Sequence, residues 1–268
     1  YWLIVLGYGF VGGIGLGIGY ISPVSTLIKW FPDRPGMATG IAIMGFGGGA
    51  LIASPWSTQM LASFGTDSSG IALAFLVHGL SYAVFMSLGV LLVRVPRGER
   101  PVEGAPSVLQ GPQVSAGSAI RTPQFWLLWV VLCMNVTAGI GILEKAAPMI
   151  QDFFKDSSTP VSVSASAGFV ALLSAANMAG RIGWSSTSDL IGRKNIYRVY
   201  LGTGAVMYAL IALFGDSSKP LFVLCAMVIL SFYGGGFATV PAYLKDLFGT
   251  HQVGAIHGRL LTAWSAAG

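Results

Sequence analysis

The chain has 268 residues, of which 54% are hydrophobic and only 9% are charged. Soluble domains carry about 25% charged residues, so this composition excludes an ordinary soluble enzyme or binding module and indicates a polytopic membrane protein. The net charge of +5 is therefore not a sign of a nucleic-acid partner. The two cysteines, Cys133 and Cys225, lie in apolar runs without the spacing of a metal site or a disulfide framework.

Apolar runs long enough to cross a bilayer, about 20 residues each, recur along the chain. We predict seven complete transmembrane helices at residues 2–28, 37–64, 71–93, 124–150, 163–188, 196–214 and 221–244, and the start of an eighth near Gly258. The expected fold class is all-α membrane. The chain starts at Tyr1 without an initiator methionine and breaks off after Gly268, so we expect a fragment of a longer protein.

A stretch rich in proline, serine, glycine and charge interrupts this pattern at residues 94–122. Such a composition is typical of a linker. We therefore predict two membrane half-domains, an incomplete one at residues 1–93 and a second at residues 123–268, joined by a cytoplasmic linker at 94–122.

The basic residues concentrate in or beside alternate short loops. This set comprises Lys29, Arg34, Arg94, Arg97, Arg100, Arg121, Arg193, Lys194, Arg198, Lys245 and Arg259. Cytoplasmic loops of membrane proteins are enriched in Lys and Arg, so these loops are expected to face the cytoplasm. We expect a multi-pass protein of the plasma membrane.

The first predicted helix is unusually rich in glycine. Residues 7–12 match the dinucleotide-binding pattern G-x-G-x-x-G, but no strand precedes them and further glycines follow. Gly9, Gly13 and Gly17 are spaced four apart, as in helices that approach another helix closely. We interpret the pattern as helix packing and not as nucleotide binding.

One arginine, Arg181, lies deep within the fifth apolar run. A charge at membrane depth costs about 2.5–3.5 kcal/mol on insertion scales, so it normally faces a bundle interior or a wet cavity. Polar residues recur around it at steps of three or four, on one face of a helix: Ser174, Asn177, Arg181, Ser185 and Ser188. A guanidinium can bind a carboxylate through two hydrogen bonds. We predict that Arg181 faces an anionic substrate; the alternative is an interhelical ion pair, for which Glu144 is the nearby acid.

Two further residues are candidates for the substrate site. Asn135 lies near mid-depth in the fourth span and could hydrogen-bond the substrate or link two helices. Tyr20 could line a cavity, although tyrosines also form the aromatic belts at membrane interfaces.

The turn at residues 188–194, SDLIGRK, resembles the D-x-x-G-R-[RK] loop of the major facilitator superfamily. In that superfamily the loop lies between helices two and three and again between eight and nine. The resemblance implies the second copy, with this chain covering about helices 4 to 11 of a fold of twelve helices in two six-helix halves. It also implies a cytoplasmic charge latch, or gating motif, made of Asp189, Gly192, Arg193 and Lys194. The glycine that usually stands four residues before the Asp is Ser185 here.

Residues 17–47, 137–151 and 234–268 look like the oxalate/formate antiporter family, whose relatives are the monocarboxylate transporters. Monocarboxylate transporters carry an Asp and, four residues later, an Arg on helix eight; the same positions here are Asn177 and Arg181. This chain therefore keeps the arginine that pairs with an anion, and it has an asparagine in place of the titratable aspartate. Oxalate-carrying members add a lysine on helix eleven, which aligns with Trp264. The resemblance thus implies a substrate site with one cation, and favours formate, lactate or pyruvate over oxalate.

Together these features predict a secondary active transporter of small carboxylates that works by alternating access and anion exchange. A proton-coupled monocarboxylate symporter and a non-transporting membrane receptor are the alternatives. A membrane-embedded enzyme would need paired acids, a histidine pair or a metal cluster at membrane depth, and the sequence offers none. We expect a monomer in the bilayer with a small organic anion as its partner, and no cofactor or metal.

Overall fold

The computed structural model describes residues 2–96 and 113–268, and seven helices in this part of the chain are long and apolar enough to cross a membrane. The first is a composite of α1 (Trp2–Ile4), the π-helical η1 (Val5–Val11) and α2 (Gly12–Trp30); the others are α3 (Pro35–Phe64), α4 (Ser68–Leu92), α6 (Pro123–Phe153), α7 (Val163–Ile191), α8 (Arg193–Phe214) with the 3₁₀ turn η3 (Gly215–Ser217), and α9 (Lys219–Phe248). Shorter helices are α5 (Ala116–Ala119), α10 (Val253–Leu260) and α11 (Thr262–Ala267). The predicted all-α membrane class and its seven complete spans are confirmed.

The eighth span was predicted to start near Gly258, but the chain is already helical from Val253. A break at Leu261 separates α10 from α11. The predicted linker at 94–122 lies largely outside the described residues. Of it, the structure describes residues 94–96 and 113–122, which include the single turn α5.

Local sequence explains where the helices begin and end. Ser162, Thr122 and Ser218 each cap a helix by accepting a backbone N–H with their hydroxyl. Gly65, Gly192 and Gly249 follow the last residues of α3, α7 and α9 with φ of 94°, 86° and 81°. Other residues adopt this left-handed region only with strain, so glycine there allows an abrupt end.

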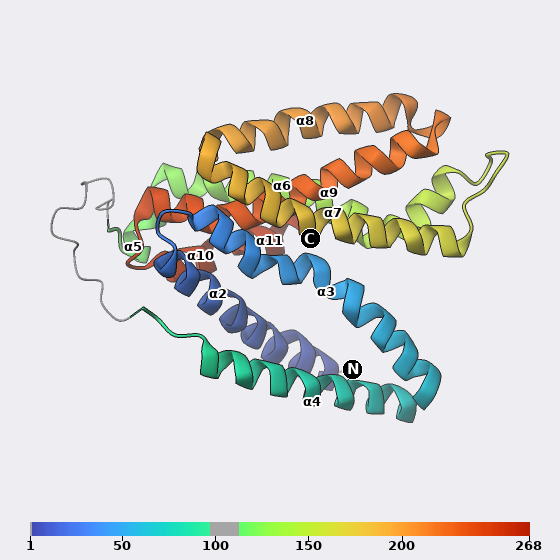
Figure 1. Ribbon diagram of the computed structural model, residues 1–268, viewed down its shortest axis with the longest axis horizontal. Coiled ribbons are helices and arrows are strands. Elements are labelled where there is room, and N and C mark those ends of the chain that lie inside the picture. Colours follow the sequence, from blue (N-terminus) through green and yellow to red (C-terminus); the bar gives the residue numbers. More distant parts are fainter. Residues whose placement is uncertain (1, 97–112) are drawn as a thin grey trace.

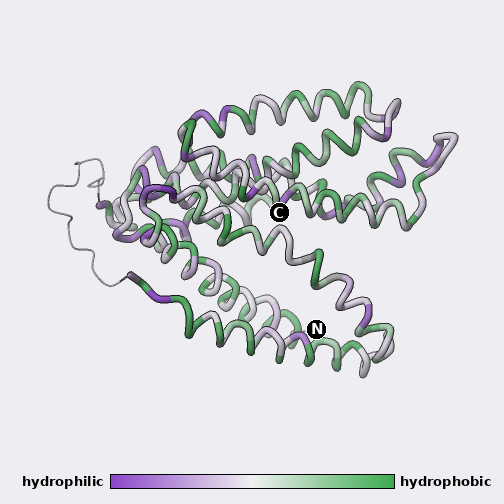
Figure 2. The backbone as a smooth tube through the Cα atoms, viewed as in Figure 1, coloured by the Kyte–Doolittle hydropathy of each residue, from purple (hydrophilic) through white to green (hydrophobic). Residues whose placement is uncertain are grey.

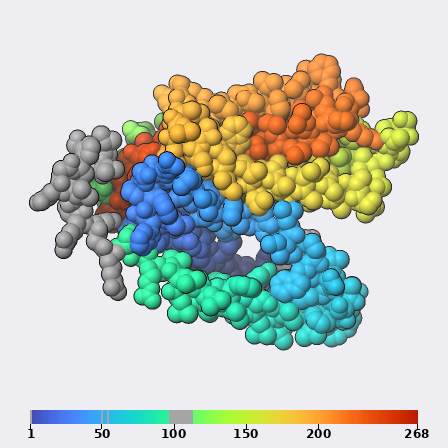
Figure 3. Space-filling view, viewed as in Figure 1, coloured from blue at the N-terminus to red at the C-terminus, as the bar shows by residue number. Residues whose placement is uncertain are grey.

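The helices form two lobes, α1–α4 and α6–α11 (Figure 1). Hydrophobic residues run along the helices, and hydrophilic ones gather mostly at their ends (Figure 2). We call the end that carries the turns at residues 31–34 and 249–252 the basic end. There α3 packs against α7 and α9, and from there the lobes diverge toward the opposite end, as Figure 3 shows.

Helix α7 lies between α3 and α9 and contacts both closely. At the α7–α9 crossing, a Cβ on Gly180 would overlap the backbone carbonyl group of Ser231. By contrast, a Cβ on Gly9, Gly13 or Gly17 meets nothing within 4 Å. The partner of this predicted glycine stripe therefore does not lie among the described residues, and its packing role stays a prediction.

The Gly180 crossing provides a test of this packing. We expect Gly180→Ala to lower the melting temperature of the purified full-length protein by about 5 °C, because overpacking costs about 1–3 kcal/mol. Gly183→Ala is the matched control, since Gly183 lies on the same helix with nothing within 4 Å of its Cβ position. Equal melting temperatures for the two variants in a thermal-unfolding assay would contradict the close crossing.

Candidate functional site

A cavity of about 420 Å³ lies between the two lobes. Residues from α2, α3, α6, α7, α9, α10 and α11 line it, so both lobes contribute to its wall. Arg181 is the lining residue with a formal charge, and Asn177 lies beside it, one turn earlier on α7. The cavity thus combines a cation with a wall drawn from both parts of the chain.

Arg181 is buried, with 5% of the residue exposed. Its Nε donates to Asn177 Oδ1 at 3.1 Å, and its Nη1 donates to the backbone carbonyl of Ile43 on α3 at 3.2 Å. The guanidinium carbon lies 5.4 Å from the centre of the Phe237 ring. Among the described residues, Arg181 forms no ion pair and its Nη2 has no hydrogen bond. A buried guanidinium with one free nitrogen is suited to bind an anion.

The burial of the polar face of α7 matches the sequence spacing. Ser174, Asn177, Arg181, Ser185 and Ser188 are all buried. Ser185 donates its hydroxyl to the carbonyl of Arg181, one turn earlier, so the stripe is internally hydrogen-bonded. Glu144, the acid considered as an ion-pair partner, is exposed and lies outside the cavity lining.

A glycine on α3 allows Arg181 to reach the opposite lobe. A Cβ on Gly47 would lie 3.2 Å from Arg181 Nε and 2.9 Å from the backbone nitrogen of Met178. The acceptor, the carbonyl of Ile43, lies one turn before Gly47. With no side chain at Gly47, that carbonyl is open to the guanidinium.

The structure brings four of the five predicted substrate residues to this cavity: Arg181, Asn177, Tyr20 and Trp264. The ring of Tyr20 packs edge-on against Phe46, with centres 5.2 Å apart, and its hydroxyl is buried without a hydrogen-bond partner among the described residues. Trp264 packs edge-on against Phe237 at 5.8 Å. A buried hydroxyl without a partner is costly, so a polar ligand group near Tyr20 would be stabilising.

Asn135, the fifth residue, is buried outside the cavity lining. Its Nδ2 donates to the backbone carbonyl of Tyr233 at 3.4 Å, and its amide lies against Gly236. Asn135 therefore links α6 to α9, behind the cavity residues Tyr233 and Phe237. The sequence did not identify Phe46 and Phe237 as cavity-lining residues, because aromatic residues are common throughout an apolar bundle.

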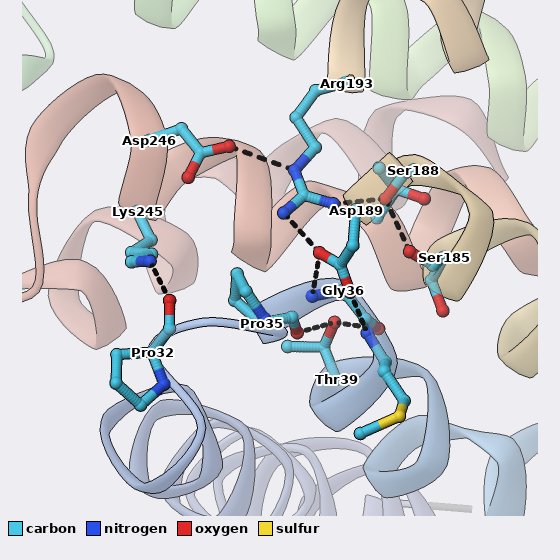
Figure 4. Close-up of polar contacts among 12 residues, drawn as sticks. Pro32, Pro35, Gly36, Thr39, Ser185, Ser188, Asp189, Arg193, Lys245 and Asp246 are labelled. Atoms are coloured by element: carbon cyan, nitrogen blue, oxygen red, sulfur yellow. Dashed lines mark hydrogen bonds and ion pairs between the residues drawn. The ribbon is translucent and has the colours of Figure 1, made fainter. Parts of the chain in front are cut away.

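A polar cluster at the basic end joins the two lobes (Figure 4). The Asp189 carboxylate accepts the backbone N–H groups of Gly36 at 2.9 Å and Met37 at 2.8 Å, in the first turn of α3. A negative charge is favourable at a helix N-terminus, where free N–H groups and the helix dipole meet. Arg193 binds Asp189 at 2.6 Å and Asp246 on α9 at 3.0 Å.

Two further contacts cross between the lobes at this end. Lys245 Nζ donates to the carbonyl of Pro32 at 2.6 Å, and the Thr39 hydroxyl donates to the carbonyl of Ala238 at 2.9 Å. Gly192 provides the left-handed turn that lets Arg193 fold back on Asp189. Lys194 is exposed and, within the described ranges, forms no hydrogen bond or ion pair. Asp189 and Arg193 of the predicted gating motif thus join Asp246 and the first turn of α3, and we call this set of contacting groups the latch.

The signature of a family described as Major Facilitator Superfamily matches residues 1–268. The chain is 30% identical over 248 residues to the oxalate:formate antiporter of Oxalobacter formigenes, covering 90% of this chain and 54% of that protein. It is 26% identical over 258 residues to the uncharacterized MFS-type transporter YhjX of Escherichia coli (strain K12), with 96% and 60% covered. It is 24% identical over 317 residues to apicoplast pyruvate carrier 1 of Toxoplasma gondii, with 96% and 56% covered. The chain thus spans little more than half the length of these curated relatives.

Proposed function

Because the chain belongs to the Major Facilitator Superfamily, whose members are transporters and not enzymes, we propose that it is part of a secondary transporter of small carboxylates. The observation that supports this most is the buried Arg181 in a cavity between two lobes, where its Nη2 has no hydrogen-bond partner in the part of the chain that the structure describes. The similarity to an oxalate:formate antiporter and a pyruvate carrier points to the same substrate class.

We propose that the substrate carboxylate pairs with Nη2 of Arg181. Asn177 holds Nε of the guanidinium and so sets its orientation. The unpartnered hydroxyl of Tyr20 is then available to donate to the carboxylate. Trp264 forms part of the apolar wall. Asn135 supports the site from behind through the backbone of Tyr233.

Alternating access would follow from the two-lobe arrangement. The latch closes the basic end, which the positive-inside rule places in the cytoplasm. Substrate at Arg181 would stabilise an occluded state, and the lobes would then rock about the central site as the latch opens. The empty carrier would cross slowly, because an unpaired guanidinium in a closing, drying cavity is costly. This difference in rate between the loaded and the empty carrier favours exchange of one anion for another.

The identity of the neighbour of Arg181 separates the candidate mechanisms. Asn177 does not titrate, so it offers no proton-coupling group beside the cation, and we propose anion exchange over proton symport. With one cation, a monocarboxylate such as formate, lactate or pyruvate is compensated better than oxalate. We propose that the carrier acts as a monomer in the plasma membrane.

Uptake into proteoliposomes that contain the full-length protein tests this function. Labelled formate, lactate, pyruvate and oxalate are supplied with and without an internal carboxylate. We expect uptake of the monocarboxylates only when an internal carboxylate is present. Uptake driven by a pH gradient alone would assign a symporter, and no flux of any carboxylate would favour a non-transporting receptor.

A further inference from the structure

Helices α2 and α10 lie side by side across the boundary between the two lobes, near the basic end (Figure 1). Two glycines of α10 face α2 in this contact. A Cβ on Gly254 would lie 3.2 Å from Ile21 Cγ2, and a Cβ on Gly258 would lie 3.1 Å from Ile21 Cδ1. Because α2 belongs to one lobe and α10 to the other, this close contact has to separate when the lobes part at the basic end.

A histidine is buried in this contact. His257 lies between the two glycines on α10 and is 2% exposed, and its ring packs against the ring of Tyr20 on α2 with centres 5.5 Å apart. His257 Nε2 and the Tyr20 hydroxyl are both buried, and among the described residues neither has a hydrogen-bond partner. The chain itself buries both atoms, so in this conformation they are closed to any other segment of a longer protein. Buried polar groups are nearly always hydrogen-bonded, so an imidazole kept here without a partner calls for an explanation.

The groups around α10 do not compensate a positive charge on His257. Helix α10 packs against α2, α5, α6, α9 and α11, of which α5 and α11 carry no ionisable side chain. The acids of α6 lie toward the opposite end of the bundle. The ionisable residues nearer the basic end are Tyr20 and Lys29 on α2, Cys133 on α6, Tyr233, Tyr243, Lys245 and Asp246 on α9, and Arg259 on α10 itself. Asp246, the acid of this set, is already bound to Arg193, and within the described ranges His257 forms no ion pair.

Burial therefore couples the charge of His257 to the position of the lobes. An imidazolium in the closed contact would be a buried charge without a partner, which is costly, so the closed state keeps the ring neutral. When the basic end opens, α10 leaves α2 and water reaches the ring. An exposed histidine takes up a proton near pH 6.5. The open state thus binds a proton that the closed state excludes, and a fall in pH shifts the equilibrium toward the open basic end.

Resting on the proposed alternating access, we propose that His257 is a cytoplasmic pH sensor of this carrier, whose protonation holds the basic end open. His257 lies about 6 Å along α10 from the start of the helix at Val253, and it does not line the cavity around Arg181. The proton therefore reaches it from the cytoplasmic side as the lobes part, and not through the substrate site. It controls which way the carrier faces and is not carried with the substrate, so this regulation is compatible with anion exchange.

Labelling of a buried cysteine in the full-length protein tests this inference. Ala38 on α3 is 4% exposed, so Ala38→Cys is expected to react with a membrane-impermeant maleimide while the basic end is open. Cys133 and Cys225 are replaced by alanine. The labelling rate at pH 7.5 and pH 5.5 is divided by the rate of the same protein carrying His257→Phe, which keeps a ring against Tyr20 and cannot be protonated. The maleimide chemistry and the other ionisable groups are the same in both proteins, so the ratio of the two rates reports the effect of His257.

We expect this ratio to rise about tenfold from pH 7.5 to pH 5.5, because an exposed histidine is mostly neutral at the first pH and mostly protonated at the second. A ratio that stays constant or falls overturns the proposal. His251→Gln is the matched control, since His251 is an exposed histidine at the same end and should leave the rise unchanged. Loss of the rise in His251→Gln would assign the effect to that residue and likewise overturn the proposal. If His257→Phe does not fold, His257→Gln takes its place.

The exchange assay in proteoliposomes separates failure of this inference from failure of the proposed function. Carboxylate exchange together with a labelling ratio that does not depend on pH leaves the transport function standing and overturns the pH sensor. A tenfold rise of the ratio without exchange of any carboxylate supports the pH sensor and overturns the carboxylate function. Neither exchange nor a rise overturns both, and exchange together with the rise supports both.

Discussion

Carboxylate exchange is expected to fall at least about 100-fold when Arg181 is replaced by methionine, because the substrate loses its charge-assisted hydrogen-bonding partner in a buried site. Methionine keeps much of the length of the side chain and removes its charge. Since the guanidinium is buried without an ion pair among the described residues, we expect the variant to keep its melting temperature. Arg181→Lys, which keeps the charge but not the planar fork, is expected to retain weak exchange.

The control for Arg181 removes an arginine outside the cavity. Arg198 is exposed on α8 and bonds Asn195 in its own helix, so Arg198→Met should leave exchange within about twofold of the wild type. Proteoliposome exchange and thermal unfolding are measured on all three variants. Exchange that survives in Arg181→Met, with the protein correctly folded, would remove Arg181 from the proposed site.

The second large effect is expected at the latch. Asp189→Asn keeps the shape of the side chain but removes the charge that binds the α3 N-terminus and Arg193. Weakening one charge-assisted contact by about 1.4 kcal/mol shifts the equilibrium between the closed and the open basic end about tenfold toward the open state. We therefore expect the basic end to open about ten times more often, at the expense of the state in which the latch is closed.

A cysteine reporter measures this opening. Ala38, on α3 near the latch, is 4% exposed, so Ala38→Cys should react slowly with a membrane-impermeant maleimide in the closed state. Cys133 and Cys225 are replaced by alanine in all of these variants, so that neither reacts with the maleimide. Asp189→Asn should raise the labelling rate about tenfold, whereas Lys194→Gln, which removes an exposed charge from the same turn, should not. An unchanged rate in Asp189→Asn would show that the latch does not control this end.

The arrangement of elements along the chain followed from the sequence. The seven spans were predicted because each requires about 20 apolar residues, and backbone hydrogen bonding leaves helices as the solution for such runs in lipid. The polar face of α7 followed from steps of three and four, which place Asn177 and Arg181 on one side of a helix. The turn after α7 followed from its Asp, Gly and Arg residues. These are local properties, and helix geometry or the membrane converts them directly into structure.

The binding partners of Asp189 and Arg181 could be found only in the tertiary structure. Asp189 binds backbone N–H groups of Gly36 and Met37, more than 150 positions earlier, and Arg181 reaches the carbonyl of Ile43. A backbone N–H or carbonyl is present at almost every residue, so sequence cannot indicate which one an ion will meet. The aromatic wall at Phe46 and Phe237, and the position of Asn135 behind it, likewise depend on how the helices rotate and cross. Packing between helices selects that rotation through contacts between residues far apart in the chain, and the periodicity of any one helix does not contain it.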